Sequence, residues 1–156
     1  DGITSMHHNS AGTRISPIEI WESRNPWLVN KIELAQDSCG AGEFRGGLGL
    51  DIEFEMLEET YVTTVVERTK LPPWGINGGK EARPNDIILI KNNGEKINIP
   101  KKTGFKLNKG EKIIFVTGGG GGYGDPKKRK KFSIEDDLKQ EYLSKDYIKE
   151  HYNFYQ

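Results

Sequence analysis

Five consecutive glycines, Gly118 to Gly122, form the segment whose composition most resembles a ligand-binding loop. Backbone N–H groups in a glycine turn can cradle a phosphate, because no Cβ hinders the anion. A phosphate loop also needs a lysine, then serine or threonine, and a helix directly after the glycines. Here Asp125-Pro126 follows instead. We therefore favour close backbone packing at Gly120 and Gly121, in a substrate or interface loop with Tyr123 as a packing anchor.

The adjacent histidines, His7 and His8, are the sequence's candidates for metal ligation. Neighbouring residues on an extended chain point to opposite faces, which suits a bidentate metal site poorly. One of them could still complete a site built by other segments, but a loop or interface role is favoured. We accordingly place His8 and Asn9 in a substrate or interface loop and predict no metal site in this chain.

Two further side chains stand out on glycine-rich loops. Arg45, within the stretch from Gly42 to Gly47, could present its guanidinium to a carboxylate or phosphate. A structural ion pair that pins the turn is the somewhat favoured alternative. Trp74, with Gly75 after it and two prolines before it, could anchor an interface or line a pocket. Burial of Trp74 in the domain's own core is an equally supported alternative.

Composition and charge limit the classes of function. Lysine plus arginine and aspartate plus glutamate both total 23, so no global field favours nucleic acid or an anionic membrane. The basic run 127–131 is best explained as a solvated linker. The single cysteine, Cys39, cannot form an internal disulfide, which fits a cytoplasmic location. No serine, cysteine or lysine lies in a recognisable nucleophile motif, so the catalytic residues are unknown.

The elements that must position these residues are mainly strands. Leu50, Ile52, Phe54 and Met56 alternate with acidic residues, as in a strand that is buried on one face. Asn93-Gly94 is a hairpin turn signal. Further runs rich in apolar and β-branched residues predict strands at 28–34, 60–69, 87–90, 96–99 and 113–117. The predicted fold class is therefore mainly β, an antiparallel sandwich or partly open barrel.

Short helices are expected near both ends of the chain. Pro17 can open one helix before Asn25-Pro26 stops it. Near the carboxyl end, Ser133 resembles the start of a capping box, and Ser144 can cap a second helix. We expect residues 1–126 to form a β-rich domain with an amino-terminal docking loop. Residues 127–156 should form a basic linker and a helical tail.

Three segments in order, 17–49, 67–79 and 119–126, resemble the hydantoinase B/oxoprolinase family. The resemblance covers nearly the whole chain and corresponds to the carboxyl-terminal third of the family's B-type subunit. The large subunits of acetone and acetophenone carboxylases form a related branch. Residues 11–16 depart from the family pattern, which has an asparagine and threonines before the proline.

The resemblance implies an enzyme component rather than a complete enzyme. In the family, an A-type subunit binds ATP and Mg and activates a carbonyl oxygen, and the B-type subunit completes the reaction. The implied reaction is hydrolytic opening of a cyclic amide or imide, with ketone carboxylation or a non-catalytic scaffold role as alternatives. Any divalent metal ligands would lie upstream, and the isolated chain should be inactive. The hydrophobic fraction of 34% also suggests that a partner supplies part of the burial.

Overall fold

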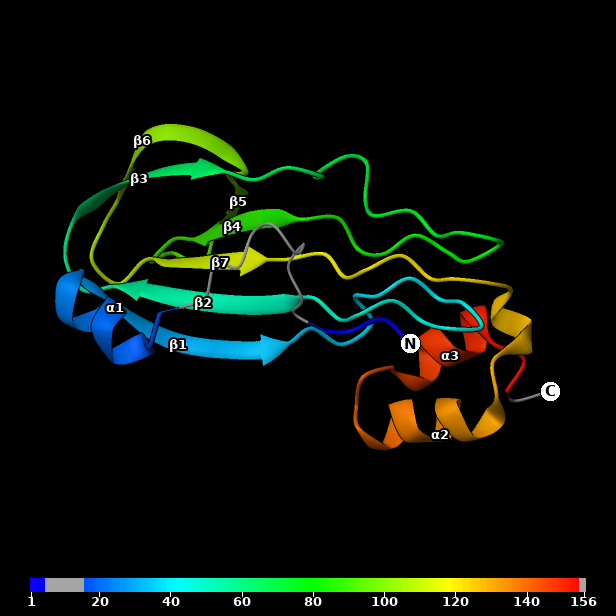
Figure 1. Ribbon diagram of the computed structural model, residues 1–156. Helices are drawn as coiled ribbons and strands as arrows, with labels where there is room; N and C mark the ends of the chain where they lie inside the picture. The colour runs from blue at the N-terminus through cyan, green and yellow to red at the C-terminus, as the bar shows by residue number, and fades with distance from the viewer. Residues whose placement is uncertain (5–15, 155–156) are drawn as a thin grey trace.

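The protein, described here by a computed structural model over residues 1–4 and 16–154, contains two antiparallel sheets (Figure 1). The larger sheet has the strand order β1-β2-β7-β4-β5, and the smaller one pairs β3 with β6. The strands are β1 Trp27–Leu34, β2 Leu50–Met56, β3 Thr60–Val65, β4 Asp86–Ile90, β5 Lys96–Asn98, β6 Lys101–Leu107 and β7 Lys112–Val116. Residues of both sheets contribute to one apolar cluster, so the predicted mainly β, antiparallel fold class is confirmed.

The core between the sheets follows from the alternation in β2. Ile52, Phe54 and Met56 are buried, while the acidic residues between them face outward. Phe54 contacts three other rings, including Trp27 of β1 in an edge-on arrangement at 5.6 Å between centroids. Residues of β4, β6 and β7 complete the same apolar cluster. Side-chain burial therefore holds this half of the molecule together.

The helices lie at the two ends of the chain. They are α1 Ile18–Arg24, the 3-10 helix η1 Pro126–Lys128, α2 Lys131–Lys139 and α3 Lys145–His151. The predicted cap of α3 is confirmed, because the Tyr147 N–H donates to Ser144 Oγ. The predicted capping box is wrong, since α2 begins at Lys131 and no side chain caps it. No helix in the described parts of the chain is long and apolar enough to cross a membrane.

Strand β6 was not predicted from sequence patterns. Its residues include three lysines and Gly104, with a φ of +59°, so it lacks the alternation of a half-buried strand. Pairing with β3, more than thirty residues earlier, makes it a strand. The expected strand 60–69 ends at Val65, and Val66 N–H then donates to the Pro100 carbonyl.

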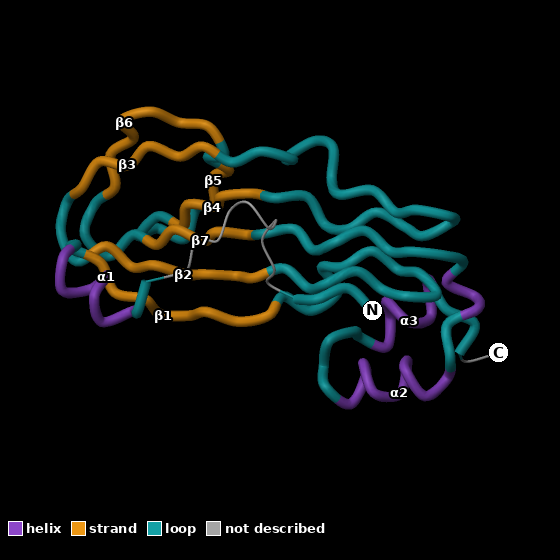
Figure 2. Tube along the Cα trace, viewed as in Figure 1, coloured by secondary structure: helices purple, strands orange, loops and turns teal. Residues whose placement is uncertain are grey.

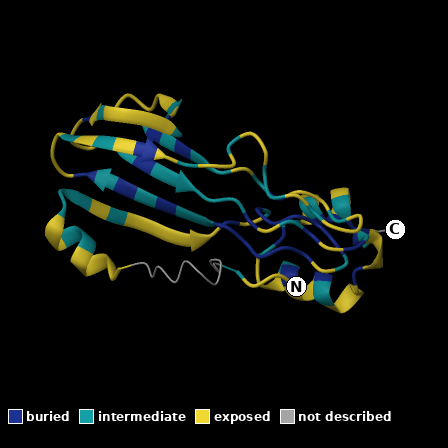
Figure 3. Cartoon of the chain, turned by 45° about the horizontal axis from the view of Figure 1, so that its top comes forward, coloured by how far each residue is buried: buried dark blue, intermediate teal, exposed yellow. Residues whose placement is uncertain are grey.

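Beyond the sheets, long loops continue in the direction of the strands toward α2 and α3 (Figure 2). They comprise residues 35–49, 66–85 and 117–125. Many of their residues are buried although they belong to no sheet (Figure 3). This looped half of the molecule holds most of the residues that the sequence marks as candidate site residues.

Candidate functional site

Three loop segments, 38–49, 74–83 and 117–124, form a laterally hydrogen-bonded unit that we call the glycine bundle. The Gly40 N–H donates to the Gly120 carbonyl at 2.8 Å, which joins the first segment to the third. The Gly122 N–H donates to the Lys80 carbonyl at 2.9 Å, and the Lys80 N–H donates to the Ala41 carbonyl at 2.7 Å. Each segment is therefore bonded to both of the others through backbone atoms.

Glycine makes this packing possible because the backbones lie too close for a Cβ. A Cβ on Gly46 would lie 1.8 Å from the Gly120 oxygen, and one on Gly121 would lie 1.9 Å from the Trp74 oxygen. At Gly120 itself the nearest atom would be 3.2 Å away. The close approach that the sequence suggests for the run is thus strongest at the neighbours of Gly120. None of the five glycines has a positive φ.

Three amide donors of the glycine run, and the amide of Tyr123 that follows it, are engaged within the bundle. Gly119 donates to the Ser38 carbonyl, Gly120 to that of Gly47, Gly122 to that of Lys80, and Tyr123 to that of Phe44. A phosphate bound here would have to replace these backbone hydrogen bonds, each of which satisfies a donor in a crowded region. The geometry therefore fits a packing role for the run and does not fit a nucleotide-phosphate site.

Arg45 lies in a buried charge network. Its Nε donates to Asp137 Oδ1 at 2.7 Å, and its Nη1 donates to the Gly46 carbonyl at 3.0 Å. Arg129 donates from Nη2 to the other oxygen of Asp137, at 2.6 Å. The Arg129 guanidinium also binds both carboxylate oxygens of Asp1, at 2.6 and 2.8 Å. The two guanidinium groups and the two carboxylates balance in charge, so Arg45 makes the structural ion pair rather than presenting its charge to a ligand.

The burial of Arg129 corrects the interpretation of the basic run as a solvated linker. Its side chain is 1% exposed, while the lysines on either side of it are exposed. The 3-10 helix η1 turns the chain so that this one cation of the run enters the network. Arg129 Nη1 also donates to the Glu43 carbonyl at 3.2 Å, which ties the helical tail to the glycine bundle.

Helices α2 and α3 cover one side of the glycine bundle with a second apolar cluster that includes Cys39, Ile134 and Ile148. The Tyr147 hydroxyl donates to the Cys39 carbonyl at 2.6 Å. Burial raises the pKa of the Cys39 thiol to about 11 and that of Tyr152 to about 12. Cys39 is therefore a protonated packing residue at neutral pH and not an activated nucleophile.

The end of the bundle carries exposed apolar side chains. Tyr123 forms single β-bridges with Phe44 on one side and Ile76 on the other. We call these three residues the aromatic tip. Tyr123 and Phe44 are each 49% exposed, and Ile76 is 55% exposed. Trp74, two residues before Ile76, is 67% exposed, and the Arg68 guanidinium lies 5.2 Å from its ring centre. Trp74 is therefore not buried in the chain's own core. The next residue, Gly75, lies so close to the Gly79 carbonyl that a Cβ would not fit there.

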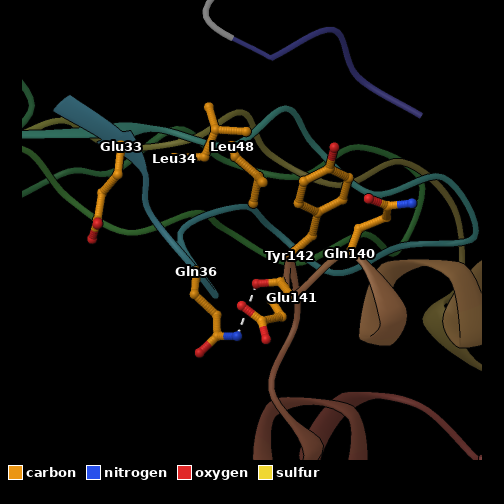
Figure 4. Close-up of a pocket in the computed structure, with 7 residues that line it drawn as sticks. All are labelled: Glu33, Leu34, Gln36, Leu48, Gln140, Glu141 and Tyr142. Carbon is orange, nitrogen blue, oxygen red and sulfur yellow. Dashed lines mark hydrogen bonds between the residues drawn. The ribbon is translucent and has the colours of Figure 1, made fainter.

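A separate pocket of about 330 Å³ opens between the end of β1 and the turn that joins α2 to α3 (Figure 4). Gln36 spans it by donating from Nε2 to the Glu141 carbonyl at 2.8 Å. The remaining lining residues are Glu33, Leu34, Leu48, Gln140 and Tyr142. Its two carboxylates belong to exposed residues, and its lining contains no nucleophile beside a base, so we assign it no catalytic role.

The structure brings together some of the predicted site residues and not others. Gly120, Gly121, Tyr123, Gly75 and Trp74 all belong to the glycine bundle, whereas Arg45 points into the charge network. His8 and Asn9 lie outside the described residues. Within residues 1–4 and 16–154, no group of three or more His, Cys, Asp or Glu side chains is arranged to hold a metal ion.

Sequence reasoning missed Asp1, Phe44 and Asp137. A signal existed for Asp137, because it lies about one helical turn after Ile134, at the margin of the apolar face of the predicted helix. A carboxylate at such a position needs a buried cationic partner. No comparable signal marks Asp1 or Phe44, whose contacts depend on the arrangement of distant segments.

The chain is similar in sequence to parts of several longer proteins. The chain is 37% identical to 5-oxoprolinase of Dictyostelium discoideum over 80% of its own length and 10% of that protein. It is also 37% identical to caprolactamase subunit beta of Pseudomonas jessenii, over 83% of the chain and 23% of the relative. The chain therefore spans less than a quarter of either relative.

Two solved structures share the fold. The crystal structure of ATP-dependent caprolactamase from Pseudomonas jessenii aligns with a TM-score of 0.77 and 33% identity, over 85% of this chain and 24% of that one. A nucleotide-free acetone carboxylase aligns with a TM-score of 0.71 at 18% identity, over 89% of this chain and 23% of that one. The second likeness shows the fold alone. The family model described as hydantoinase B/oxoprolinase matches residues 1–126, and the chain belongs to this family.

Proposed function

We propose that this chain is a segment of the B-type component of an ATP-dependent enzyme that hydrolytically opens a cyclic amide. The observation that carries the proposal is the structural match to ATP-dependent caprolactamase at 33% identity. The similarity to 5-oxoprolinase agrees, because 5-oxoproline and caprolactam are both lactams. Acetone carboxylase shares the fold at only 18% identity, which favours amide hydrolysis over the alternative of ketone carboxylation.

The chemistry assigns different tasks to different components. An amide is a poor electrophile, and phosphorylation of its carbonyl oxygen by ATP would open it to attack by water. In this proposal an A-type partner holds ATP and Mg, and an upstream B region holds any further divalent metal. The amides of Gly119, Gly120 and Gly122 donate backbone hydrogen bonds within the bundle, which supports nucleotide binding elsewhere than in this chain.

The contribution of this chain is then to hold its neighbours in place. The glycine bundle is cross-linked by backbone hydrogen bonds and is tied to α2 by the Arg45–Asp137 pair, features of a rigid support. The same features favour a second candidate, a scaffold that docks catalytic components without touching the substrate. The two candidates differ in whether altering the bundle's surface changes the rate constant of the assembled enzyme or only its assembly.

The proposal is tested by reconstitution. The chain is produced together with the upstream B region and an A-type partner, and 5-oxoproline, caprolactam and hydantoin are supplied with ATP and Mg. Mass spectrometry should detect a ring-opened product in step with ADP release, and omission of ATP or of the upstream region should abolish it. Carboxylation of acetone with bicarbonate, without opening of any of the three rings, would overturn lactam hydrolysis in favour of the ketone carboxylase.

A further inference from the structure

The aromatic tip presents three apolar side chains on one face of the glycine bundle. Phe44 and Ile76 lie directly opposite Tyr123 in their two β-bridges, and residues opposite each other across a bridge project to the same side. The rings of Phe44 and Tyr123 are 6.4 Å apart between centroids. The Asn77 side chain donates to the Tyr123 hydroxyl at 2.8 Å and fixes the ring's outer edge. The row is therefore ordered rather than a set of loose side chains.

A row of exposed apolar side chains at the surface is typical of a contact with another protein surface. Each tip residue is about half exposed, and Trp74 is 67% exposed just before Ile76. Clustered exposed aromatic residues with a polar rim are typical of protein contacts, and a few such anchors carry most of the binding energy. The members of the tip are uncharged, so they fit an apolar protein surface better than an ionic ligand.

The position of Asp1 indicates which protein surface would contact the aromatic tip. The carboxylate of Asp1 is held by Arg129 and also accepts the backbone N–H of Arg45, at 3.0 Å. The Gly2 N–H donates to the Arg45 carbonyl at 2.7 Å. Arg45 follows Phe44 directly, so Asp1 is bound one residue away from the tip. Because the chain covers 23% of caprolactamase subunit beta, more than three quarters of a protein of that type would lie outside this chain. An upstream polypeptide joined at Asp1 would emerge beside Phe44.

We propose that the aromatic tip is the docking surface for the upstream part of the same B-type protein, a partner that presents an apolar groove to Phe44, Ile76 and Tyr123. This inference rests on the proposed function only in assuming that a B-type upstream region exists. Docking of that region fixes the glycine bundle against the rest of the protein whether the reaction is amide hydrolysis or carboxylation.

The test compares the reactivity of single engineered thiols in the isolated chain and in the complete B-type protein. Ile76→Cys and, separately, Phe44→Cys report on the tip, and Val65→Cys on β3 is the matched control, because Val65 is 72% exposed and lies in the sheet half. Each variant is labelled with a maleimide, and peptide mass spectrometry gives the rate at the engineered position. The tip thiols should react about tenfold or more slowly in the complete protein, since docking must open before labelling, while Val65→Cys should react equally in both.

The condition under which the tip thiols are protected identifies which protein covers the aromatic tip. Protection in the complete B-type protein without the A-type subunit, and independent of protein concentration, supports docking of the upstream region. Equal labelling of both tip positions in the two proteins overturns the proposal. Protection only after the A-type subunit is added overturns it in favour of that subunit. Protection that grows with concentration of the isolated chain overturns it in favour of a second copy. Since no turnover is measured, failure of the proposed reaction leaves this result unchanged.

Discussion

The two halves of this molecule are held together by opposite means. In the sheet half, large side chains such as Phe54 and Leu89 fill the space between two β layers. In the glycine bundle, backbones lie against one another with no room for a Cβ, as at Gly46 beside the Gly120 oxygen. The sheet half is stabilised mainly by apolar burial, whereas the bundle adds lateral hydrogen bonds and a buried charge network to the apolar cluster on the side that α2 and α3 cover.

The two halves are therefore expected to respond differently to mutation. A cavity-forming change destabilises the sheet half in proportion to the side-chain volume removed. The bundle is sensitive instead to added atoms, because a new Cβ would meet backbone that cannot move without breaking hydrogen bonds. A surface built on such a bundle is rigid, which suits the presentation of the aromatic tip to a partner.

The largest effect is expected for Gly46→Ala. The added methyl group would lie 1.8 Å from the Gly120 oxygen, so two bundle segments must separate. We expect a loss of about 5 kcal/mol in the free energy of unfolding, at the upper end for point mutations. Urea denaturation followed by circular dichroism measures the loss. Gly120→Ala is the control, because its Cβ would lie 3.2 Å from the nearest atom. Equal stability of the two variants would show that the bundle yields to added volume.

Asp137→Ala should have the next largest effect. It leaves the guanidinium groups of Arg45 and Arg129 buried, with only Asp1 to balance them. Removing one partner from a buried ion pair costs about 3–5 kcal/mol. Asp136→Ala, at an exposed position on the same helix, should change stability by less than about 0.5 kcal/mol. Thermal unfolding of both variants checks the difference, and a similar melting temperature for the two would contradict the importance of the network.

Alkaline pH should weaken the packing of the tail on the bundle. The folded-state pKa of Cys39 is raised by burial from 9.0 to about 11, so the folded state holds this proton more tightly than the unfolded state. Its stabilising contribution is complete below pH 9 and is lost as the pH rises through 11, by roughly 2–3 kcal/mol in total.

The variant Cys39→Ala isolates this contribution. Denaturant titrations at pH 8, 9, 10 and 11 should give a shallower decline for the variant than for the parent. Tyr152, whose pKa is raised to about 12, adds its own loss at the highest pH in both proteins. Identical pH profiles for parent and variant would contradict the assignment to Cys39.

The smallest effect is expected in the sheet half. Ile113→Val removes one methylene from a residue that is 3% exposed between the two layers. We expect a loss of about 1 kcal/mol, typical of this substitution in a core. Val65→Ala, at an exposed position on β3, should cost less and serves as the comparison. A loss at Ile113 that approaches that of Gly46→Ala would remove the contrast between the two halves.

Local sequence patterns were sufficient to predict much of the fold. The alternation from Leu50 to Met56, the Asn93-Gly94 turn and the Ser144 cap each depend on neighbours within a few residues, and each is confirmed. The lack of a lysine after the glycine run disfavours a phosphate loop from sequence alone. These features follow from short-range sterics and periodicity, which the order of residues determines directly.

Only the tertiary structure decided what surrounds those elements. Arg129 belongs to a lysine-rich run, yet it pairs with Asp1, 128 residues away, and Arg45 pairs with Asp137 across 92 residues. Strand β6 likewise forms because β3 offers it an edge, and the aromatic tip exists because three loops place Phe44, Ile76 and Tyr123 side by side. The energies of such contacts depend on burial and on partners that are distant in the chain, so no local pattern encodes them.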